Sequence, residues 1–259
     1  MMLPPRLTSL IATTCLCAGL AGVETELRLG PEELVIDSEF QSQYLYEGAV
    51  RTEATTWRNH VRGRFYDIGL QLDAYLLLED DEQLDLDIGS VFELRARADY
   101  LLEIEGIAQI IPNVRYQYFP EFEDEVDEPV WVGVDGWYLL PVEGLELGGG
   151  VSADLTDEHG WYVEFGMREF FQQAPLDLTA WQLVTAGSGD YHEWTSGADD
   201  AGFGAINLGA LLTLPLPWQN CYATIRTEVS TWLMDEDRDA VDDDLEFAVS
   251  AGFEWRPNY

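Results

Sequence analysis

Basic side chains recur at every second position in two segments of the chain. Side chains two apart on a strand point to the same face, so each segment has a basic face and a face with apolar residues such as Trp57 and Val61. A guanidinium stays charged at physiological pH and pairs well with carboxylates. Such a face can sort solutes by charge or pair with nearby acids. The positions are Arg58, His60, Arg62 and Arg64 in the first segment, and Arg95 and Arg97 in the second.

More arginines and many acids fall on the polar face when the same alternation is followed along the chain. An arginine that faces hydrocarbon at the middle of a membrane costs about 2–4 kcal/mol. A membrane-embedded chain must therefore turn this face inward, and we predict a lumen lined by arginine and carboxylate. The predicted lumen-lining residues are Arg58, His60, Arg62, Arg64, Asp73, Arg95, Arg97, Asp99, Glu103, Arg115, Asp135, Arg168 and Arg226, accompanied by Glu146, Asp154, Glu164, Glu228 and Glu246.

Twelve segments show the period of two that a half-apolar strand requires. Longer acidic connections alternate with short ones rich in Pro and Gly. This alternation is typical of an up-and-down transmembrane β-barrel with short periplasmic turns and longer extracellular loops. We therefore predict an all-β, antiparallel fold of about twelve strands. They cover roughly 38–47, 56–66, 70–78, 93–104 (extending back towards residue 84), 107–118, 130–140, 145–155, 161–171, 176–186, 202–214, 219–232 and 244–256.

The N-terminal residues have the features of a secretory signal. Arg6 is their only charge, an apolar stretch follows, and small residues near Ala21 offer a cleavage site. No later run reaches about 18 apolar residues, so passage through a membrane requires strands. The mature chain would keep only Cys221 and form no intrachain disulfide. The predicted parts are a signal peptide at 1–22, a short periplasmic segment at 23–37 and the barrel at 38–259.

The formal net charge of −36 restricts the partners of the chain. It excludes a nucleic-acid partner, because binding phosphates requires clustered cations. The same acidity would suit the surface of a soluble, salt-adapted protein. Acids crowd the loops, however, whereas the arginines fall largely inside strand patterns. This separation favours the membrane barrel.

Aromatic residues lie near both ends of the predicted strands, as the interfacial girdles of membrane barrels do. Tyr46, Trp57, Tyr118 and Trp161 lie near the end with the acidic loops, and Phe65, Phe171 and Trp255 near the end with the short turns.

The predicted interior admits two interpretations. Eight strands leave an interior filled by side chains, whereas 16–18 leave a broad channel, and twelve lie between. Opposed arginines and carboxylates would set a field in a water-filled lumen and sort solutes, or would pair and plug it. Inward glycines indicate either open volume or bending of the strands. They are Gly133, Gly148, Gly150, Gly166, Gly209 and Gly252.

Metal and cofactor sites are not predicted. The acidic loops at 121–128 and 235–244 lack the Gly and the closing Glu of an EF-hand. Solvated loops are the default interpretation. A bridge through divalent cations to lipopolysaccharide is a milder alternative.

Two histidines in the acidic loops raise an enzymatic alternative. His159 follows Asp157 and Glu158, and His192 lies between nearby acids. A carboxylate and a histidine can activate water, and a hydrolase at the barrel rim would place them there. Such neighbours arise easily by chance in acidic loops, so we predict no catalytic residues.

Short motifs give the chain a family resemblance. They are Ser42-Gln43-Tyr44-Leu45-Tyr46-Glu47-Gly48, Tyr116-Gln117-Tyr118-Phe119-Pro120, and an aromatic-rich final strand ending at Tyr259. In these segments the chain resembles bacterial outer-membrane porins, above all those of the TorF type. An Arg commonly precedes the first-strand Gly in that family, where Glu47 stands here. The resemblance implies a porin-like barrel that a terminal aromatic marks for insertion, and it transfers no substrate or catalytic residue.

We therefore expect an outer-membrane barrel that passes small polar solutes, with membrane lipid and lipopolysaccharide as its surroundings. A closed structural or adhesive barrel with cation-gathering loops is the main alternative. The rival fold is a secreted β-sandwich or lipocalin-like barrel, whose apolar faces would point inward and whose charges would point outward.

Overall fold

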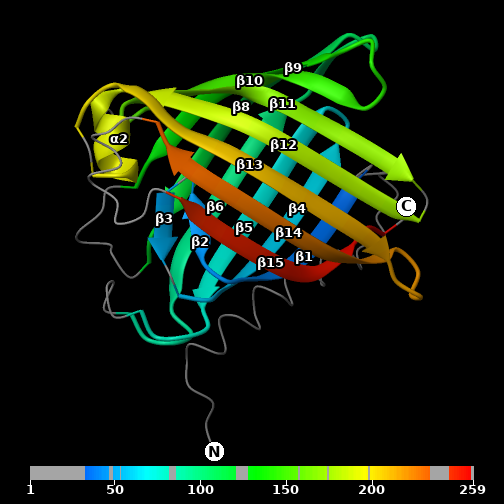
Figure 1. The fold of residues 1–259 in the computed structure, drawn as a ribbon, viewed down its shortest axis with the longest axis horizontal. Helices are drawn as coiled ribbons and strands as arrows, with labels where there is room; N and C mark the ends of the chain where they lie inside the picture. The colour runs from blue at the N-terminus through cyan, green and yellow to red at the C-terminus, as the bar shows by residue number, and fades with distance from the viewer. Residues whose placement is uncertain are drawn as a thin grey trace, which may run out of the picture. The chain divides into compact units, whose positions relative to one another are not determined.

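Antiparallel strands make up most of the described chain (Figure 1). The structure is a computed structural model and describes residues 33–46, 49–52, 54–81, 86–120, 128–156, 158–173, 175–197, 199–233 and 245–257. The elements are β1 (Glu33–Gln41), β2 (Tyr44–Tyr46), β3 (Ala49–Thr52), β4 (Thr56–Phe65), β5 (Ile68–Leu77), β6 (Val91–Tyr100), β7 (Leu102–Ile104), β8 (Ala108–Tyr118), β9 (Val130–Leu139), β10 (Leu145–Asp154), β11 (Trp161–Gln173), β12 (Leu176–Gly187), α2 (Gly189–Thr195), β13 (Gly202–Pro215), β14 (Cys221–Trp232) and β15 (Glu246–Trp255).

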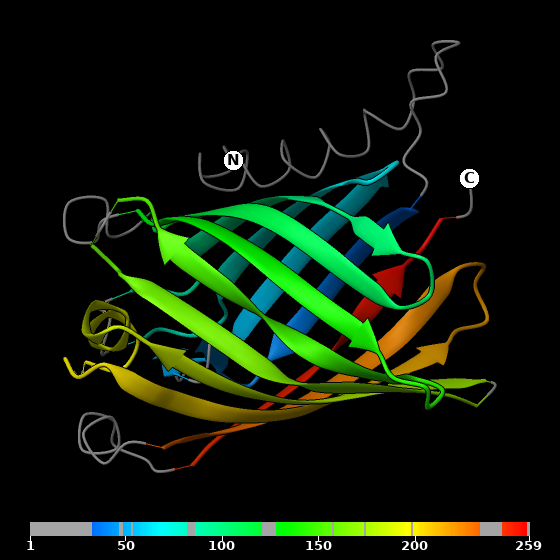
Figure 2. The ribbon, with the colours of Figure 1, turned by 90° about the horizontal axis from the view of Figure 1, so that it is seen from above.

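The strands close into a ring in which each one pairs antiparallel with its neighbours. From β8 to β15 the order in the sheet follows the order in the chain, β1 then pairs with β15, and β6 pairs with β8 to complete the ring. β7 continues β6 after one residue and also pairs with β8, so the barrel has twelve strands and one extra strand. Figure 2 shows the two walls, with green and yellow strands in front of blue and red ones. The predicted fold class is confirmed.

The two ends of the barrel differ, as the sequence predicts. The N-terminal ends of β5, β8, β10, β12 and β14 follow short turns, whereas the connections at the other end of the ring strands are longer. The helix α2 and the separate β2–β3 hairpin lie at the end with the long connections, on the left of Figure 1. The long connections span 42–55, 78–90, 119–129, 155–160, 188–201 and 233–245.

The short turns reverse the chain through left-handed backbone conformations. Tyr66 and Asn220 have φ of 55° and 59°, and Gly106 and Gly144 have φ of 65° and 77°. Glycine adopts this region without steric cost, and asparagine tolerates it better than most other residues. The Pro- and Gly-rich composition of these segments is therefore a direct requirement of tight turns between adjacent strands.

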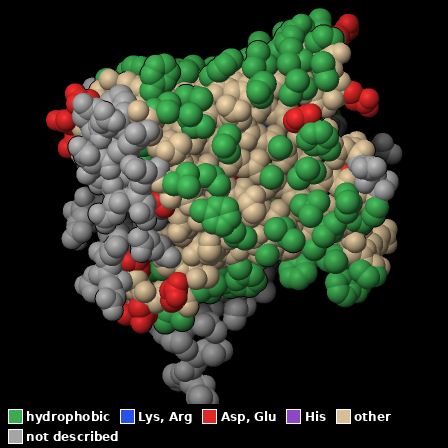
Figure 3. Space-filling view, in the orientation of Figure 1, with side chains coloured by type: hydrophobic (Ala, Val, Ile, Leu, Met, Phe, Trp, Pro, Cys, Tyr) green, Lys and Arg blue, Asp and Glu red, His purple; other side chains and the backbone are tan. Residues whose placement is uncertain are grey.

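Exposure alternates along the strands and shows which face is inside. On β5, Leu72 is 56% exposed and the next residue, Asp73, is 5% exposed. On β15, Phe253 is 59% exposed, whereas Ser250 is 4% exposed. Hydrophobic side chains cover much of the barrel wall visible in Figure 3, and the acidic side chains in view lie towards its ends. The barrel is thus apolar outside and polar inside, opposite to a β-sandwich or a lipocalin-like barrel.

The first strand differs from its prediction. It covers Glu33–Gln41 instead of 38–47, and Tyr44–Tyr46 belong to the β2–β3 hairpin. The ring strand therefore begins five residues before the predicted one and ends six residues before it. The physical reason is that alternation continues from β1 into the hairpin, so the pattern does not show where pairing with the ring stops.

The fourth strand also differs, because it begins at Val91 and does not extend towards residue 84. Asp81 and Leu86 form an isolated bridge instead, and Gly89 turns the chain with a φ of 86°. The register between β12 and β13 shifts between Val184 and Ala186.

Several predictions lie outside the described residues. These are the signal peptide at 1–22, the residues 23–32 of the predicted periplasmic segment, the acidic stretches 121–127 and 234–244, and the terminal Tyr259. Among the described residues, helices are too short and too polar to cross a membrane.

Candidate functional site: the charged barrel interior

One network of charges joins β1, β4 and β5. The guanidinium of Arg58 lies 3.0 Å from Asp73 Oδ1, 3.2 Å from Glu39 Oε2 and 3.9 Å from Asp37 Oδ1. His60 Nδ1 lies 2.8 Å from the same oxygen of Asp73. The register explains the grouping, because His60 pairs directly with Asp37 on one side and with Asp73 on the other.

A second network extends from β4 to β9. Arg64 Nη2 lies 3.0 Å from Asp99 Oδ1, and Arg97 Nε lies 3.6 Å from the other oxygen of that carboxylate. Arg97 Nη2 also lies 2.7 Å from Asp135 Oδ2, which accepts a hydrogen bond of 3.2 Å from Asn113 Nδ2. Two carboxylates thus hold one arginine from either side.

Arg95 has both an acid and aromatic rings beside it. It forms an ion pair with Glu93 of its own strand, and its guanidinium carbon lies 5.0 Å from the centroid of Tyr75. Gln117 Nε2 donates to Glu93 over 2.9 Å, and Trp131 Nε1 donates to Gln117 over 2.9 Å. This chain of hydrogen bonds fixes the carboxylate that faces Arg95.

Aromatic side chains also position Arg115 and Arg168. Arg115 lies over Tyr162, at 5.5 Å from the ring centroid, and donates to its hydroxyl. Arg168 lies over Trp137, at 3.4 Å from the centroid, and pairs with Glu146 over 3.0 Å. Stacking on an aromatic face suits a planar guanidinium better than an ammonium. This preference accords with the exclusive use of arginine in the chain.

Arg226 lies over Trp181, with 5.7 Å between its guanidinium carbon and the ring centroid. Gly209 makes room for this tryptophan, because a Cβ there would lie 2.1 Å from the ring. Ser152 and Asp135 occupy the space beside Gly133 and Gly150 in the same way. At these positions the inward glycines accommodate neighbouring side chains.

Two predicted residues stand apart from the networks. Arg62 shares a row across the sheet with Gln71, Arg97 and Arg115, and its buried Nε has no hydrogen-bond partner among the described residues. Glu103 is exposed on β7, near the short-turn end.

One cavity of about 240 Å³ opens among these side chains. Its arginines come from strands that are distant in the sequence, since Arg58 lies on β4 and Arg226 on β14. The structure thereby brings five of the predicted arginines to a single space. The polar side chains around the cavity are Gln41, Arg58, Gln71, Asp73, Arg95, Arg97, Arg115, Gln117, Arg226 and Glu228, joined by Tyr44 and Tyr75.

Aromatic residues collect at the long-loop end of the interior. One cluster packs Tyr44 of β2 against Tyr75 and Phe92, and a second combines Trp131 with residues of β11 and α2. Trp194 of α2 packs against both clusters. Residues from a loop helix and a loop hairpin thus narrow the interior at this end.

The two loop histidines are buried instead of exposed at the rim. His159 Nδ1 lies 2.7 Å from Asp154 Oδ2, and its ring lies 5.0 Å from that of Trp194. His192 Nε2 lies 3.3 Å from the carbonyl oxygen of Gly202. Both rings therefore hold loops against the barrel, His159 through Asp154 of β10 and His192 through Gly202 of β13. Asp157 lies outside the described residues.

Sequence reasoning missed several members of the interior. Glu39 and Glu93 contact arginines, Gln117 links Glu93 to Trp131, and Trp194 joins the aromatic clusters. Glu39 and Glu93 stand at alternate positions with other polar residues of their strands, and this alternation could have identified them as inward-facing. Nothing in the sequence pattern indicates that Trp194 folds back into the barrel.

Comparison with solved structures identifies the type of barrel. The chain is similar to the KdgM porin, in a structure described as a complex with disordered oligogalacturonate, with a TM-score of 0.53 and 12% identity over 85% of this chain and 98% of that one. It is similar to the NanC porin, with a TM-score of 0.54 and 10% identity over 86% and 98%. The shared feature is the fold, a β-barrel that covers most of both chains.

No protein-family model matches the chain, and no curated protein matches it. At identities this low, similarity to the two porins establishes the fold alone. The finer resemblance to porins of the TorF type stays a prediction.

The network around Asp73 generates a test of stability. Asp73→Asn removes the charge that faces both Arg58 and His60. Breaking a buried pair from one side leaves an uncompensated charge, so we expect a loss of roughly 3–5 kcal/mol. Unfolding in increasing concentrations of guanidinium chloride, with the protein refolded in lipid vesicles, measures this change in the free energy of unfolding.

Glu105→Gln serves as the control, because Glu105 is exposed in a short turn. It should change the free energy of unfolding by no more than about 0.5 kcal/mol. An equally small effect of Asp73→Asn would contradict the role given to this network.

Proposed function

We propose that the protein is an outer-membrane porin that passes small polar or charged solutes through its charged interior. The observation that carries this proposal is the cavity lined by five arginines and two carboxylates inside a barrel with an apolar outer face. Fixed charges beside a water-filled path sort solutes by charge.

The placement of the ion pairs supports an open path through the barrel rather than an interior plugged by salt bridges. Arg58 pairs with the adjacent strands β1 and β5, Arg168 pairs with adjacent β10, and Arg64 and Arg97 reach strands two places away in the ring. Pairs of this kind lie along the wall. The ion pairs of these four arginines therefore join strands that are at most two places apart in the ring.

The location follows from the same physics. An apolar band around a closed ring of strands fits a bilayer, where each backbone polar group must be satisfied within the protein. Outer-membrane lipid and lipopolysaccharide are then the surroundings, with the short turns in the periplasm. The predicted signal peptide would direct export.

Charge placed at two depths on the outer face tests the membrane location. Leu72 and Ile68 are both exposed on β5, the first near mid-strand and the second at the short-turn end. In lipid vesicles, Leu72→Arg should cost roughly 2–4 kcal/mol and Ile68→Arg roughly 0–1 kcal/mol. Reversible unfolding measures both. Equal costs would argue against a lipid-facing band.

Conductance tests the pore. Purified protein in a planar bilayer should give discrete current steps, and replacing Arg62, Arg95 or Arg97 with Ala should shift preference towards cations. One unit charge acts on an ion about 5 Å away with about 0.8 kcal/mol in water, which is about a fourfold change in preference. Arg97→Lys keeps the charge and should keep the preference. The absence of current steps at a high protein concentration would contradict the proposed pore.

The aromatic clusters at the long-loop end favour a closed barrel as the second candidate. Trp194 joins both clusters, so Trp194→Ala should loosen this end. A porin narrowed there would conduct more current per step after the change. A closed structural barrel would stay silent in both forms.

A further inference from the structure

We infer that the cavity contains an oxyanion-binding subsite centred on Arg226, which takes a carboxylate or phosphate group of the solute. Insofar as the anion is a solute in transit, the inference rests on the proposed porin function. The subsite itself is argued from the surroundings of Arg226.

Arg226 is a lumen arginine that lines the cavity together with Glu228 but forms no ion pair with it. In the described part of the chain, its guanidinium makes no ion pair, and its buried Nε has no hydrogen-bond partner. Arg168 is the matched comparison, because it too lies over a tryptophan but pairs with Glu146 over 3.0 Å. A guanidinium stays charged in proteins, so Arg226 keeps a positive charge that requires an anion.

The arrangement around Arg226 fixes the guanidinium before a ligand arrives. Trp181 supplies the face over which it lies, and Gly209 provides the space for that ring. Leu211 pairs with Arg226 on β13, and Ser250 pairs with it on β15. A planar guanidinium that is already held binds a carboxylate or phosphate through two parallel hydrogen bonds. This geometry favours an oxyanion over a spherical ion.

The cavity around Arg226 is rich in arginine. Arg58, Arg95, Arg97 and Arg115 also line it, against the two carboxylates of Asp73 and Glu228. Asp73 already contacts Arg58 and His60, which leaves Glu228 as the acid nearest in sequence to Arg226 on the same strand face. Arg58, Arg95 and Arg97 form ion pairs with carboxylates, so their charge is already compensated and Arg226 is more available to an anion than they are.

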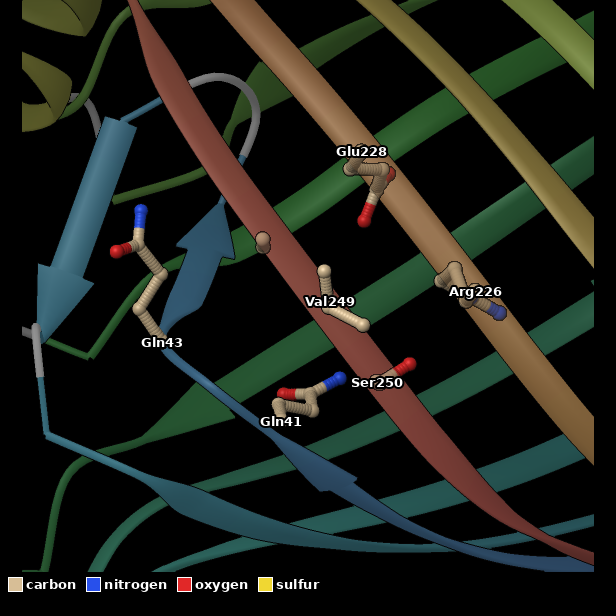
Figure 4. A pocket seen from close by; sticks show the side chains of 7 residues that line it. Gln41, Gln43, Arg226, Glu228, Val249 and Ser250 are labelled. Carbon is tan, nitrogen blue, oxygen red and sulfur yellow. The ribbon is translucent and has the colours of Figure 1, made fainter.

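Neutral donors complete the surroundings. Gln41, Gln43 and Ser250 line a smaller pocket of about 20 Å³ together with Arg226 and Glu228. Figure 4 shows Arg226 and Glu228 on β14, with Gln41 and Gln43 beyond β15. A pocket of this size holds about one water. We expect that water to link the bound oxyanion to the amides.

The experiment uses the full chain in detergent micelles. Its thermal unfolding midpoint is measured in increasing potassium phosphate, and separately in potassium acetate, each against potassium chloride at equal ionic strength. At ten times the dissociation constant, binding to the folded state should raise the midpoint by about 3–6 °C. The two arms show whether the site prefers phosphate or carboxylate.

Two substitutions on the same strand should act in opposite directions. Arg226→Gln removes the bidentate donor and should weaken the apparent affinity about tenfold or more. Glu228→Gln removes a repelling charge and should strengthen it. Arg168→Gln is the matched control, because it removes a stacked lumen arginine and should leave the dependence on phosphate and acetate unchanged.

The outcomes separate this inference from the pore. Equal dependence on the oxyanions in wild type and Arg226→Gln, or none in wild type, overturns the subsite even if the barrel conducts. Dependence that Arg226→Gln abolishes supports it, even in a barrel that passes no current. If Arg226→Gln does not fold, Arg226→Lys replaces it. That variant keeps the charge without the fork, so an affinity equal to wild type would also overturn the subsite.

Discussion

Closure of the ring of backbone hydrogen bonds is the constraint on which the rest of the structure depends. β1 pairs with β15, and β6 pairs with β8, so the sheet has no free edge. Each strand then has one face towards the interior and one towards the surroundings. With the period of two, this assigns every side chain to one side. Leu72 beside Asp73 and Val249 beside Ser250 therefore both face outward.

Register decides what the interior charges do. His60, Asp73 and Arg95 share one row across β4, β5 and β6, so opposite charges face each other. In the next row Arg97 lies directly opposite Arg115, and like charges in that position are unfavourable. Arg97 resolves this by reaching the carboxylates of neighbouring rows. Where register offers no acid, as at Arg226, an aromatic face takes its place.

The period of two and the alternation of connections were enough to predict the fold from the sequence. Turn chemistry supports them, since a tight reversal needs a residue such as Gly106 or Asn220 in the left-handed region. The pattern failed at the first strand because Tyr44 continues the alternation after β1 has left the ring. The alternation in a sequence shows which residues share one face of a strand. It does not show which residue of a neighbouring strand each of them pairs with.

The same limit applies to the candidate site. Parity groups Arg58, Arg168 and Arg226 as equivalent, yet their surroundings differ. Arg58 is held by carboxylates, Arg168 by a carboxylate and a ring, and Arg226 by a ring. These differences depend on the register of strands that lie far apart in the chain, and on a glycine that admits Trp181.

The loops and the interior differ in charge, so a solute meets acidic residues as it approaches the barrel and arginines once it is inside. The chain carries a net charge of −36, and its acids crowd the loops, whereas the cavity holds five arginines and two carboxylates. At physiological salt, exposed charges are largely screened beyond about 8 Å. The acidic loops therefore act on a solute only near them, and within the narrow interior the arginines are the nearer charges. An acidic protein can in this way present arginine donors to an anion that has entered the barrel.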